Sequence, residues 1–314
     1  MGAPLRKTPR AATRSALNLS ALLSVILLAG LAPGCTSDPP ALIEGIEAEE
    51  SYKPHKNPHD APLEPPYSRS PDGSLHRHLS AGKLKFIEIV PEGVDPKAAL
   101  PLLIHFHGLA DMPRLPAAGT RHPSIPARIL LPRGPYLFEK GFAWYPYRAR
   151  ENRHEEMKRA LEGTAHHLAR FYNEVGERFP SPCKPISVGF SQGGMITLAA
   201  ALLRPESLSS AIALAAYLPP ELIPEGAGDG RLSIRMIHGL DDRIVPHEPT
   251  VAISETMKAR GFDVELSLLE GMQHASTPES DRLLGEAIRA ALAKCIKDDA
   301  PSELMDTAFI AESP

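Results

Sequence analysis

The sequence lacks both a strong imbalance of charge and an apolar run long enough to cross a membrane. Over 314 residues, 34 Lys and Arg stand against 38 Asp and Glu, a formal net charge of −4. A chain with no basic excess has little to offer a phosphate backbone, so we expect no nucleic-acid partner. The apolar stretch 16–31 is shorter than the roughly 20 residues of a membrane span and contains Asn18, which disfavours a transmembrane helix.

The same stretch has the layout of a secretory signal peptide. Basic residues without an acid precede it, and small residues follow it up to Cys35. We therefore expect residues 1–34 to be a signal peptide and the protein to be exported. Small residues before a lone cysteine resemble the bacterial lipoprotein box, in which the cysteine is acylated. That resemblance implies a cell-envelope lipoprotein, in the outer membrane or periplasm, anchored to the membrane by lipid on Cys35; a plain secreted protein is the alternative.

Proline and charge divide the rest of the chain into three parts. Residues 35–75 are rich in proline with almost no periodic apolar pattern, which predicts a semi-rigid tether. Residues 298–314 are polar and predict a flexible C-terminal tail. One compact domain, residues 76–297, remains between them. With 43% hydrophobic residues, the chain has enough apolar material for a sizeable core.

Within this domain, predicted strands alternate with predicted helices. Continuous apolar runs bounded by Gly, Pro or charge are typical of strands covered on both faces. Such runs, or in the first case a looser alternation, occupy residues 84–90, 100–106, 127–131, 186–190, 211–215, 232–237 and 264–269. Helical patterns begin at a capping pair of Asn152 and Glu155, after Ser191, and at Thr277 and Pro278. The alternation predicts an α/β fold with a mostly parallel central sheet, helices on both faces, and a ligand site at the carboxyl ends of the strands.

Ser191 lies between a predicted strand and a predicted helix, in the pattern Gly-x-Ser-x-Gly. The glycines on either side, Gly189 and Gly193, remove side chains that would clash where the chain reverses sharply. The helix that follows directs its positive end toward any oxyanion. This context predicts that Ser191 is a catalytic nucleophile.

An activated serine needs a base, and the base needs an orienting carboxylate. In α/β-hydrolases the acid and the histidine follow the nucleophile on loops after later strands. The loop after strand 232–237 contains Asp241 and Asp242, and the loop after strand 264–269 contains His274. For the oxyanion hole we expect the backbone amides of Gln192, directly after the serine, and Leu109, in the loop after an early buried strand.

Several motifs in chain order resemble the phospholipase/carboxylesterase family of α/β-hydrolases, which includes the acyl-protein thioesterases. They are His-Gly-Leu-Ala-Asp at 107–111, Gly-Phe-Ala-Trp-Tyr at 141–145, Gly-Phe-Ser-Gln-Gly-Gly at 189–194, the acid loop at 238–246, and Gly-x-x-His at 271–274. The resemblance implies an α/β-hydrolase fold and, by its spacing to Val-Pro, selects Asp242 over Asp241. It also places Trp144 on the substrate side. Two positions depart from the family pattern: Ala110 replaces a glycine and Arg243 replaces a proline.

These features predict an exported serine carboxylesterase that acts on small-molecule esters through a covalent acyl-enzyme. Residues 111–126 and 216–231 are short and rich in Pro or Gly, so neither predicts a lid of the kind that lipases use. We therefore expect an open site that binds a short acyl group against Trp144. The alternatives are a lysophospholipase or thioesterase, a polyester depolymerase or peptidase on the same fold, or, outside enzymes, a non-catalytic binding lipoprotein.

The remaining histidines and cysteines predict structure rather than chemistry. His105 and His107 share a strand face, as a metal pair would, but no third ligand is apparent, so we expect no metal and no cofactor. We expect His166 and His167 to lie on a helix surface. Cys183 and Cys295 are both expected at the sheet edge opposite the active site. An oxidising compartment would allow them to pair, provided that their Cα atoms lie within roughly 7 Å of each other.

Overall fold

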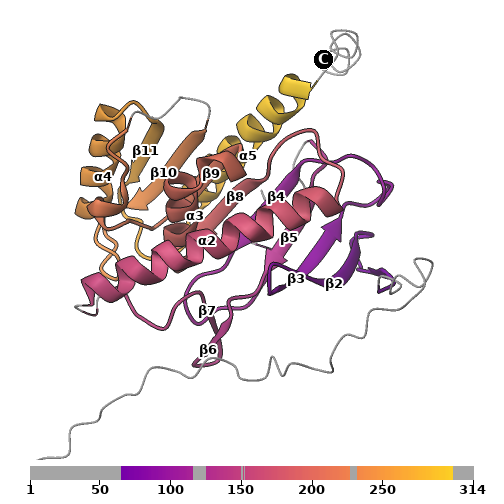
Figure 1. The fold of residues 1–314 in the computed structure, drawn as a ribbon, viewed down its shortest axis with the longest axis horizontal. Helices are drawn as coiled ribbons and strands as arrows, with labels where there is room; N and C mark the ends of the chain where they lie inside the picture. The colour runs from indigo at the N-terminus through magenta and orange to yellow at the C-terminus, as the bar shows by residue number, and fades with distance from the viewer. Residues whose placement is uncertain (1–64, 116–124, 150, 152, 227–231, 300–314) are drawn as a thin grey trace, which may run out of the picture. The chain divides into compact units, whose positions relative to one another are not determined.

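The computed structural model describes residues 65–115, 125–149, 151, 153–226 and 232–299. Within these ranges, the central sheet has nine strands in the order β1-β2-β3-β5-β4-β8-β9-β10-β11 (Figure 1). The strands are β1 (Ser68–Arg69), β2 (Leu75–Ala81), β3 (Leu84–Val90), β4 (Leu102–Phe106), β5 (Arg128–Pro132), β8 (Ile186–Phe190), β9 (Ser210–Leu214), β10 (Ser233–Gly239) and β11 (Asp263–Leu269). All pairings from β5 to β11 are parallel, and those of β1, β2 and β3 are antiparallel. The predicted mostly parallel sheet is confirmed.

Helices cover both faces of this sheet. They are α2 (His154–Arg178), α3 (Gln192–Leu203), α4 (Glu248–Ala259) and α5 (Pro278–Asp299), with short 3₁₀ turns η1 (Pro205–Ser207) and η2 (Pro220–Leu222). A two-stranded hairpin, β6 (Tyr136–Phe138) and β7 (Gly141–Ala143), precedes α2. Figure 1 shows α2 crossing the strands on the same side as α3.

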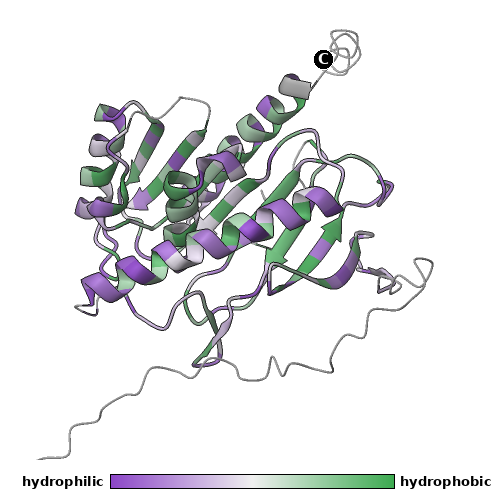
Figure 2. Ribbon diagram, in the orientation of Figure 1, coloured by the Kyte–Doolittle hydropathy of each residue, from purple (hydrophilic) through white to green (hydrophobic). Residues whose placement is uncertain are grey.

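Side chains of each central strand alternate between two apolar clusters, because successive residues of a strand point to opposite faces. On β4, Leu102 and Ile104 pack with α2, α3 and α4, whereas Leu103 packs with α5. Residues of α5 in the second cluster include Leu284 and Ile288. Figure 2 shows the central strands mostly green and α2 mixed purple and green, as expected for a sheet covered on both faces and a helix covered on one.

Every strand expected from the apolar runs is present, with ends that differ by at most two residues. The folded domain, however, begins earlier than the predicted residue 76. Strand β1 pairs with β2 in the segment expected to be tether. Both residues of β1 are exposed and polar, so this edge strand has no apolar alternation to reveal it.

The ends of two helices differ from the sequence prediction. The N-cap of α2 is Arg153, which makes no side-chain cap hydrogen bond; Asn152, the expected capping residue, lies outside the described residues. Helix α5 continues through Asp299, two residues into the predicted tail. At the start of α5 the prediction is confirmed, because the Thr277 hydroxyl accepts a hydrogen bond of 3.1 Å from the Ser280 N–H.

The expected signal peptide, Cys35 and most of the expected tether and tail lie outside the described residues. Among the helices that are described, none combines the length and apolar character needed to span a membrane.

A disulfide joins Cys183 to Cys295, with their Cα atoms 5.3 Å apart. Cys183 lies shortly before β8 and Cys295 near the end of α5. Because Ser191 follows the other end of β8, the bridge lies at the opposite edge of the sheet from the serine, where the sequence predicted both cysteines.

A buried ionic cluster joins three neighbouring strands of the sheet, β2, β3 and β5. Glu88 of β3 is fully buried and binds the guanidinium groups of Arg77 on β2 and Arg128 on β5. The hydroxyl of Tyr67, just before β1, donates a 3.0 Å hydrogen bond to the same carboxylate. The attraction of the two guanidinium groups and the hydrogen bond from Tyr67 offset the cost of taking the carboxylate out of water.

Candidate active site

Ser191 stands at a sharp turn between β8 and α3. Its backbone is in a left-handed region, with φ of 53° and ψ of −119°, which a non-glycine residue adopts only when its surroundings hold it there. A Cβ atom at Gly189 would lie 2.1 Å from the carbonyl oxygen of Gly193, and one at Gly193 would lie 2.2 Å from that of Phe106. The two glycines therefore allow a backbone approach that any side chain would prevent.

The structure brings Ser191, His274 and Asp242 into one chain of hydrogen bonds. The Nε2 atom of His274 is 2.9 Å from Ser191 Oγ, and its Nδ1 atom is 2.7 Å from Asp242 Oδ2. Since a carboxylate only accepts, the Nδ1–H donates to Asp242 and the Nε2 lone pair faces the serine hydroxyl. This is the arrangement of a general base next to a nucleophile.

These residues meet because β8, β10 and β11 run parallel in one sheet, so their carboxyl ends share an edge. The acid loop and the histidine loop also touch directly. Asp241 N–H donates to the Met272 carbonyl at 3.1 Å, and a Cβ atom at Gly239 would lie 2.0 Å from the same oxygen. The positions of Asp242 and His274 are thereby fixed relative to each other.

The carboxylate of Asp242 is held by its own loop. Its Oδ1 atom accepts hydrogen bonds of 2.9 Å from the backbone N–H groups of Ile244 and Val245. This leaves Oδ2 for His274. Because the second oxygen is anchored, the carboxylate cannot rotate away from the imidazole without losing two buried hydrogen bonds.

The loop after β4 places Leu109 along the same cleft as Ser191 and Gln192, the first residue of α3. In the described part of the chain, neither the backbone N–H of Leu109 nor that of Gln192 finds a hydrogen-bond acceptor. Ala110, at the position of the family glycine, has a φ of 60°. Its N–H donates to Phe142 of β7 at 2.9 Å. The loop therefore keeps its left-handed turn without glycine, tied to the β6–β7 hairpin.

The side chain of His107 holds this loop through two hydrogen bonds to backbone groups. Its Nδ1 atom lies 2.7 Å from the Gly108 carbonyl, and its Nε2 atom accepts the Gly134 N–H at 3.0 Å. These partners require the neutral tautomer with the proton on Nδ1. Burial lowers the pKa of His107, which favours the same uncharged form.

The cleft beside Ser191 has a volume of about 360 Å³. Its apolar walls include Tyr145, Tyr147, Met195 and Ile244. A neighbouring cavity of about 530 Å³ shares Gly108, Phe190 and His274 with the cleft. Ser191 lines the cleft and not this second cavity, so the cleft is the space beside the nucleophile.

Trp144 does not line this cleft, so the expectation that an acyl group would rest against it is corrected. The side chain is buried, 2% exposed, and its ring packs against Phe106. Its indole N–H donates to the His107 carbonyl at 2.8 Å. Trp144 thus supports the loop that contains Leu109 instead of touching a substrate.

The side chain of Gln192 was not expected to matter, since the sequence motif pointed only to its backbone amide. Its Oε1 atom accepts a hydrogen bond of 2.8 Å from the backbone N–H of Trp144. Its Nε2 atom donates to the backbone carbonyls of Tyr145 and Tyr147 at 2.8 and 3.3 Å. The residue after the nucleophile therefore anchors the segment that forms one wall of the cleft. A buried glutamine in an apolar helix, α3, is the sequence signal for such an anchor.

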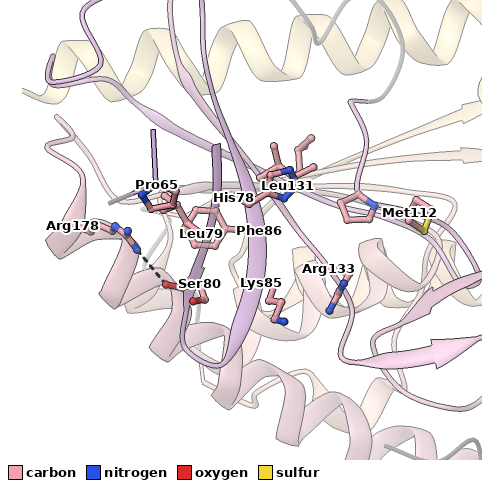
Figure 3. A pocket seen from close by; sticks show the side chains of 12 residues that line it. Pro65, His78, Leu79, Ser80, Lys85, Phe86, Met112, Leu131, Arg133 and Arg178 are labelled. Atoms are coloured by element: carbon pink, nitrogen blue, oxygen red, sulfur yellow. Dashed lines mark hydrogen bonds between the residues drawn. The ribbon is translucent and has the colours of Figure 1, made fainter. Parts of the chain in front are cut away.

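Another cavity, of about 590 Å³, lies away from Ser191 (Figure 3). It is formed by β2, β3, β5 and the segment after β4, and its cationic side chains include Lys85, Arg133 and Arg178. The hydrogen bond drawn there joins Arg178 to the Ser80 carbonyl at 3.2 Å. With no nucleophile paired to a base among its lining residues, this cavity is not the candidate active site.

Metal-ligating side chains do not gather in threes anywhere in the described ranges. His105 is buried, its Nε2 atom has no hydrogen-bond partner among the described residues, and burial lowers its pKa to about 3. His166 and His167 are exposed on α2, where the sequence placed them.

Comparison with known proteins agrees with this geometry. A family model described as Phospholipase/Carboxylesterase matches residues 87–292. Acyl-protein thioesterase 1 of Gibberella zeae is 29% identical over 117 residues, which cover 35% of this chain and 50% of that protein. Acyl-protein thioesterase 1 homolog 1 of Dictyostelium discoideum is 26% identical over 155 residues, 48% of this chain and 69% of that protein. The match to the first of these relatives thus spans half of its length.

Solved structures show the same fold at low sequence identity. Esterase PE8 is 21% identical with a TM-score of 0.54, covering 72% of this chain and 100% of that one. The Bacillus cereus carboxylesterase is 18% identical with a TM-score of 0.55, covering 68% and 95%. The family match extends from within β3 to within α5 and includes Ser191, Asp242 and His274. The chain therefore belongs to the phospholipase/carboxylesterase family of α/β-hydrolases, whose members include esterases and thioesterases.

Proposed function

We propose that this protein is a serine carboxylesterase with Ser191, His274 and Asp242 as its catalytic triad. The observation that carries the proposal is the unbroken chain of hydrogen bonds from Ser191 Oγ through the His274 imidazole to Asp242. A binding protein has no use for a serine held in a left-handed turn with a histidine lone pair directed at its hydroxyl.

In the first half of the reaction, Ser191 Oγ attacks the ester carbonyl carbon while His274 Nε2 accepts the hydroxyl proton. The carbonyl oxygen becomes an oxyanion, and the N–H groups of Leu109 and Gln192 receive its charge. One donor of this kind is worth about 10² to 10³ in turnover. His274 then returns the proton to the leaving alcohol, and the acyl group stays on Ser191.

In the second half, a water molecule replaces the alcohol. His274 Nε2 takes a proton from the water, whose oxygen attacks the acyl carbon. The tetrahedral intermediate collapses with release of a carboxylic acid, and the proton returns to Ser191. Asp242 keeps the imidazole in the required tautomer and stabilises the imidazolium in both halves.

Short acyl groups fit this site best. The apolar walls near Ser191 enclose about 360 Å³, and each methylene that finds no wall forgoes about 0.8 kcal/mol. In the described part of the segment after β9, the turn η2 directs Leu222 and Ile223 into the core. Those side chains are therefore not available to cover a long acyl chain. We expect no rate increase when a triglyceride passes its solubility limit.

A thioester substrate is the second candidate, because the relatives named above are acyl-protein thioesterases. The same triad attacks an ester or a thioester carbonyl, because the nucleophile and the oxyanion donors do not contact the leaving atom in the first step. Butyryl thiocholine and butyryl choline, which differ only in that atom, distinguish the two by their kcat/KM values.

Export and lipid attachment are also part of the proposal. Residues 1–34 act as a signal peptide, and Cys35 carries the lipid that anchors the enzyme to the cell envelope. Radiolabelled palmitate should enter the parent protein and not the Cys35→Ser variant. A mature protein of unmodified mass that begins elsewhere would contradict the anchor and leave the esterase proposal intact.

The decisive experiment combines hydrolysis with covalent labelling. The parent protein should hydrolyse nitrophenyl acetate and butyrate and react with a fluorophosphonate probe, and Ser191→Ala should do neither while keeping its circular dichroism spectrum. Ser254→Ala, which removes a buried hydroxyl from α4, is the matched control and should keep both activities. Labelling of Ser191→Ala, or an unreactive parent protein, would reject the triad.

A further inference from the structure

A second histidine lies beside the proposed catalytic acid. His238, near the end of β10, is fully buried. Its Nε2 atom is 2.9 Å from the Val245 carbonyl oxygen and 3.5 Å from Asp242 Oδ2, the oxygen that binds His274. Val245 in turn donates its N–H to the other oxygen of Asp242. The His238 imidazole therefore lies against both Asp242 and Val245, which are themselves joined by a hydrogen bond in the acid loop.

The opposite side of the same ring is bound to a different part of the fold. The Nδ1 atom of His238 is 2.9 Å from the hydroxyl oxygen of Thr250, in the first turn of α4. That hydroxyl is also 3.0 Å from the carbonyl oxygen of Ala216, which follows β9. Through Thr250, the acid loop is joined to α4 and to the segment after β9, neither of which contributes a residue to the lining of the cleft beside Ser191.

These partners determine the state of the ring. Burial lowers the pKa of His238, although the Val245 carbonyl and the Asp242 charge oppose the shift, so the ring is neutral at pH 7. A carbonyl oxygen only accepts, so the proton is on Nε2 and Nδ1 is an acceptor. The one hydrogen of the Thr250 hydroxyl is then shared between Nδ1 and the Ala216 carbonyl oxygen. The opposite tautomer would direct a lone pair at two oxygen atoms.

We propose that His238 is a positioning residue of the reaction, held by Thr250 in the tautomer that fixes Asp242 against His274. This inference rests on the proposed function of the triad. The Nε2–H of His238 holds Val245, and so the loop, and it also faces the oxygen that stabilises the His274 imidazolium. Loss of this N–H would let the carboxylate move away from His274 in the transition state. Ile244 and Val245 of this loop line the cleft, but the walls formed by Tyr145, Tyr147 and Met195 come from other elements and stay in place.

The test compares variants that keep or lose single hydrogen bonds, with nitrophenyl butyrate as substrate. His238→Leu should lower kcat by about 10²-fold, the cost of a displacement of about 1 Å, and change KM by less than about twofold. In His238→Gln the amide N–H occupies the place of Nε2–H, so most of kcat should return. Thr250→Val should lower kcat, whereas Thr250→Ser, which keeps the hydroxyl, should not.

Ile253→Ala is the matched control, because Ile253 is buried on the same helix as Thr250 but belongs to the apolar core. It should lower the urea midpoint of unfolding and leave kcat unchanged. An equal loss of kcat in Ile253→Ala and His238→Leu would reduce His238 to a stability role and overturn the proposal.

The same measurements distinguish failure of the positioning role of His238 from failure of the proposed triad. A parent protein that neither hydrolyses the ester nor reacts with a fluorophosphonate would reject the proposed function. A reactive parent protein with full kcat in His238→Leu would reject only the positioning role. If His238→Leu does not fold, the comparison of Thr250→Val with Thr250→Ser decides, and equal kcat values for these two would overturn the proposal.

Discussion

Asp241 and Asp242 are neighbours in sequence, yet the first is exposed and the second is 5% exposed and bound to His274. In Asp242→Asn an amide would face His274 Nδ1 and impose the wrong tautomer, which lowers kcat about 10⁴-fold in the best-studied triad. Asp241→Asn should change kcat less than twofold. Steady-state kinetics on nitrophenyl butyrate measure both, and a larger loss for Asp241→Asn would reverse the assignment.

The anchor formed by Gln192 gives a second prediction. Gln192→Ala keeps the backbone amide of the oxyanion hole. It leaves the backbone N–H of Trp144 and the backbone carbonyl of Tyr145 without the glutamine side chain that binds them. Each unsatisfied buried group costs about 1–3 kcal/mol. We expect a clear fall in urea stability and a rise in KM, because Tyr145 and Tyr147 form a wall of the cleft. Unchanged KM with reduced stability would mean that the anchor does not shape the site.

Gly193 should tolerate no side chain at all. A Cβ atom there would meet the backbone of Phe106 at 2.2 Å and of His107 at 2.6 Å. Gly193→Ala must push β4 away from the turn, at about 1–3 kcal/mol or more, and should reduce ester hydrolysis because the oxyanion loop follows His107. Gly176→Ala is the control, since nothing lies within 4 Å of a Cβ at that exposed site of α2. It should raise stability by about 0.5–1 kcal/mol.

Acid should destabilise the fold through its buried histidines. The folded-state pKa of His105 is about 3 against an ordinary value of 6.5. The unfolded chain therefore binds the proton first, and stability is full above about pH 6.5 and falls as the pH drops toward 3. From pH 7 to pH 5 this one group should remove about 2 kcal/mol.

Urea unfolding of His105→Leu at both pH values checks this prediction. The variant should lose about 2 kcal/mol less than the parent protein between pH 7 and pH 5. Some acid sensitivity should remain, because burial also lowers the pKa values of His107 and His238. Equal losses in parent and variant would show that His105 does not titrate as its burial requires.

The disulfide should stabilise the fold without serving catalysis. The bridge closes a loop with a sequence separation of 112 residues, for which the loss of unfolded-state entropy corresponds to about 4–5 kcal/mol. Cys183→Ala with Cys295→Ala should lose about 2–5 kcal/mol and keep its kcat at 25 °C. Reductant should bring the parent protein to the same urea midpoint. A large loss of kcat in the folded double variant would contradict this separation.

The sequence predicted best the features that depend on local spacing and strand order. The turn at Ser191 follows from its glycines, and the meeting of Asp242 with His274 follows from parallel strands whose ends share an edge. Trp144 could not be placed in this way, because packing against Phe106 and His107 decides which way its ring points. Helix α4 was missed because two of its four buried residues, Thr250 and Ser254, are polar and hide the apolar period.

Tyr67 also determines how far the chain can be shortened for recombinant production. A truncated protein that begins at His76 would keep every proposed catalytic residue but lose the hydroxyl that Tyr67 donates to Glu88. It would also lose β1, which pairs with Leu75 and His76 at the outer edge of β2. An open strand edge is a template for pairing with another chain. Shortened versions that start before Tyr67 should therefore remain soluble at concentrations where those that start at His76 aggregate.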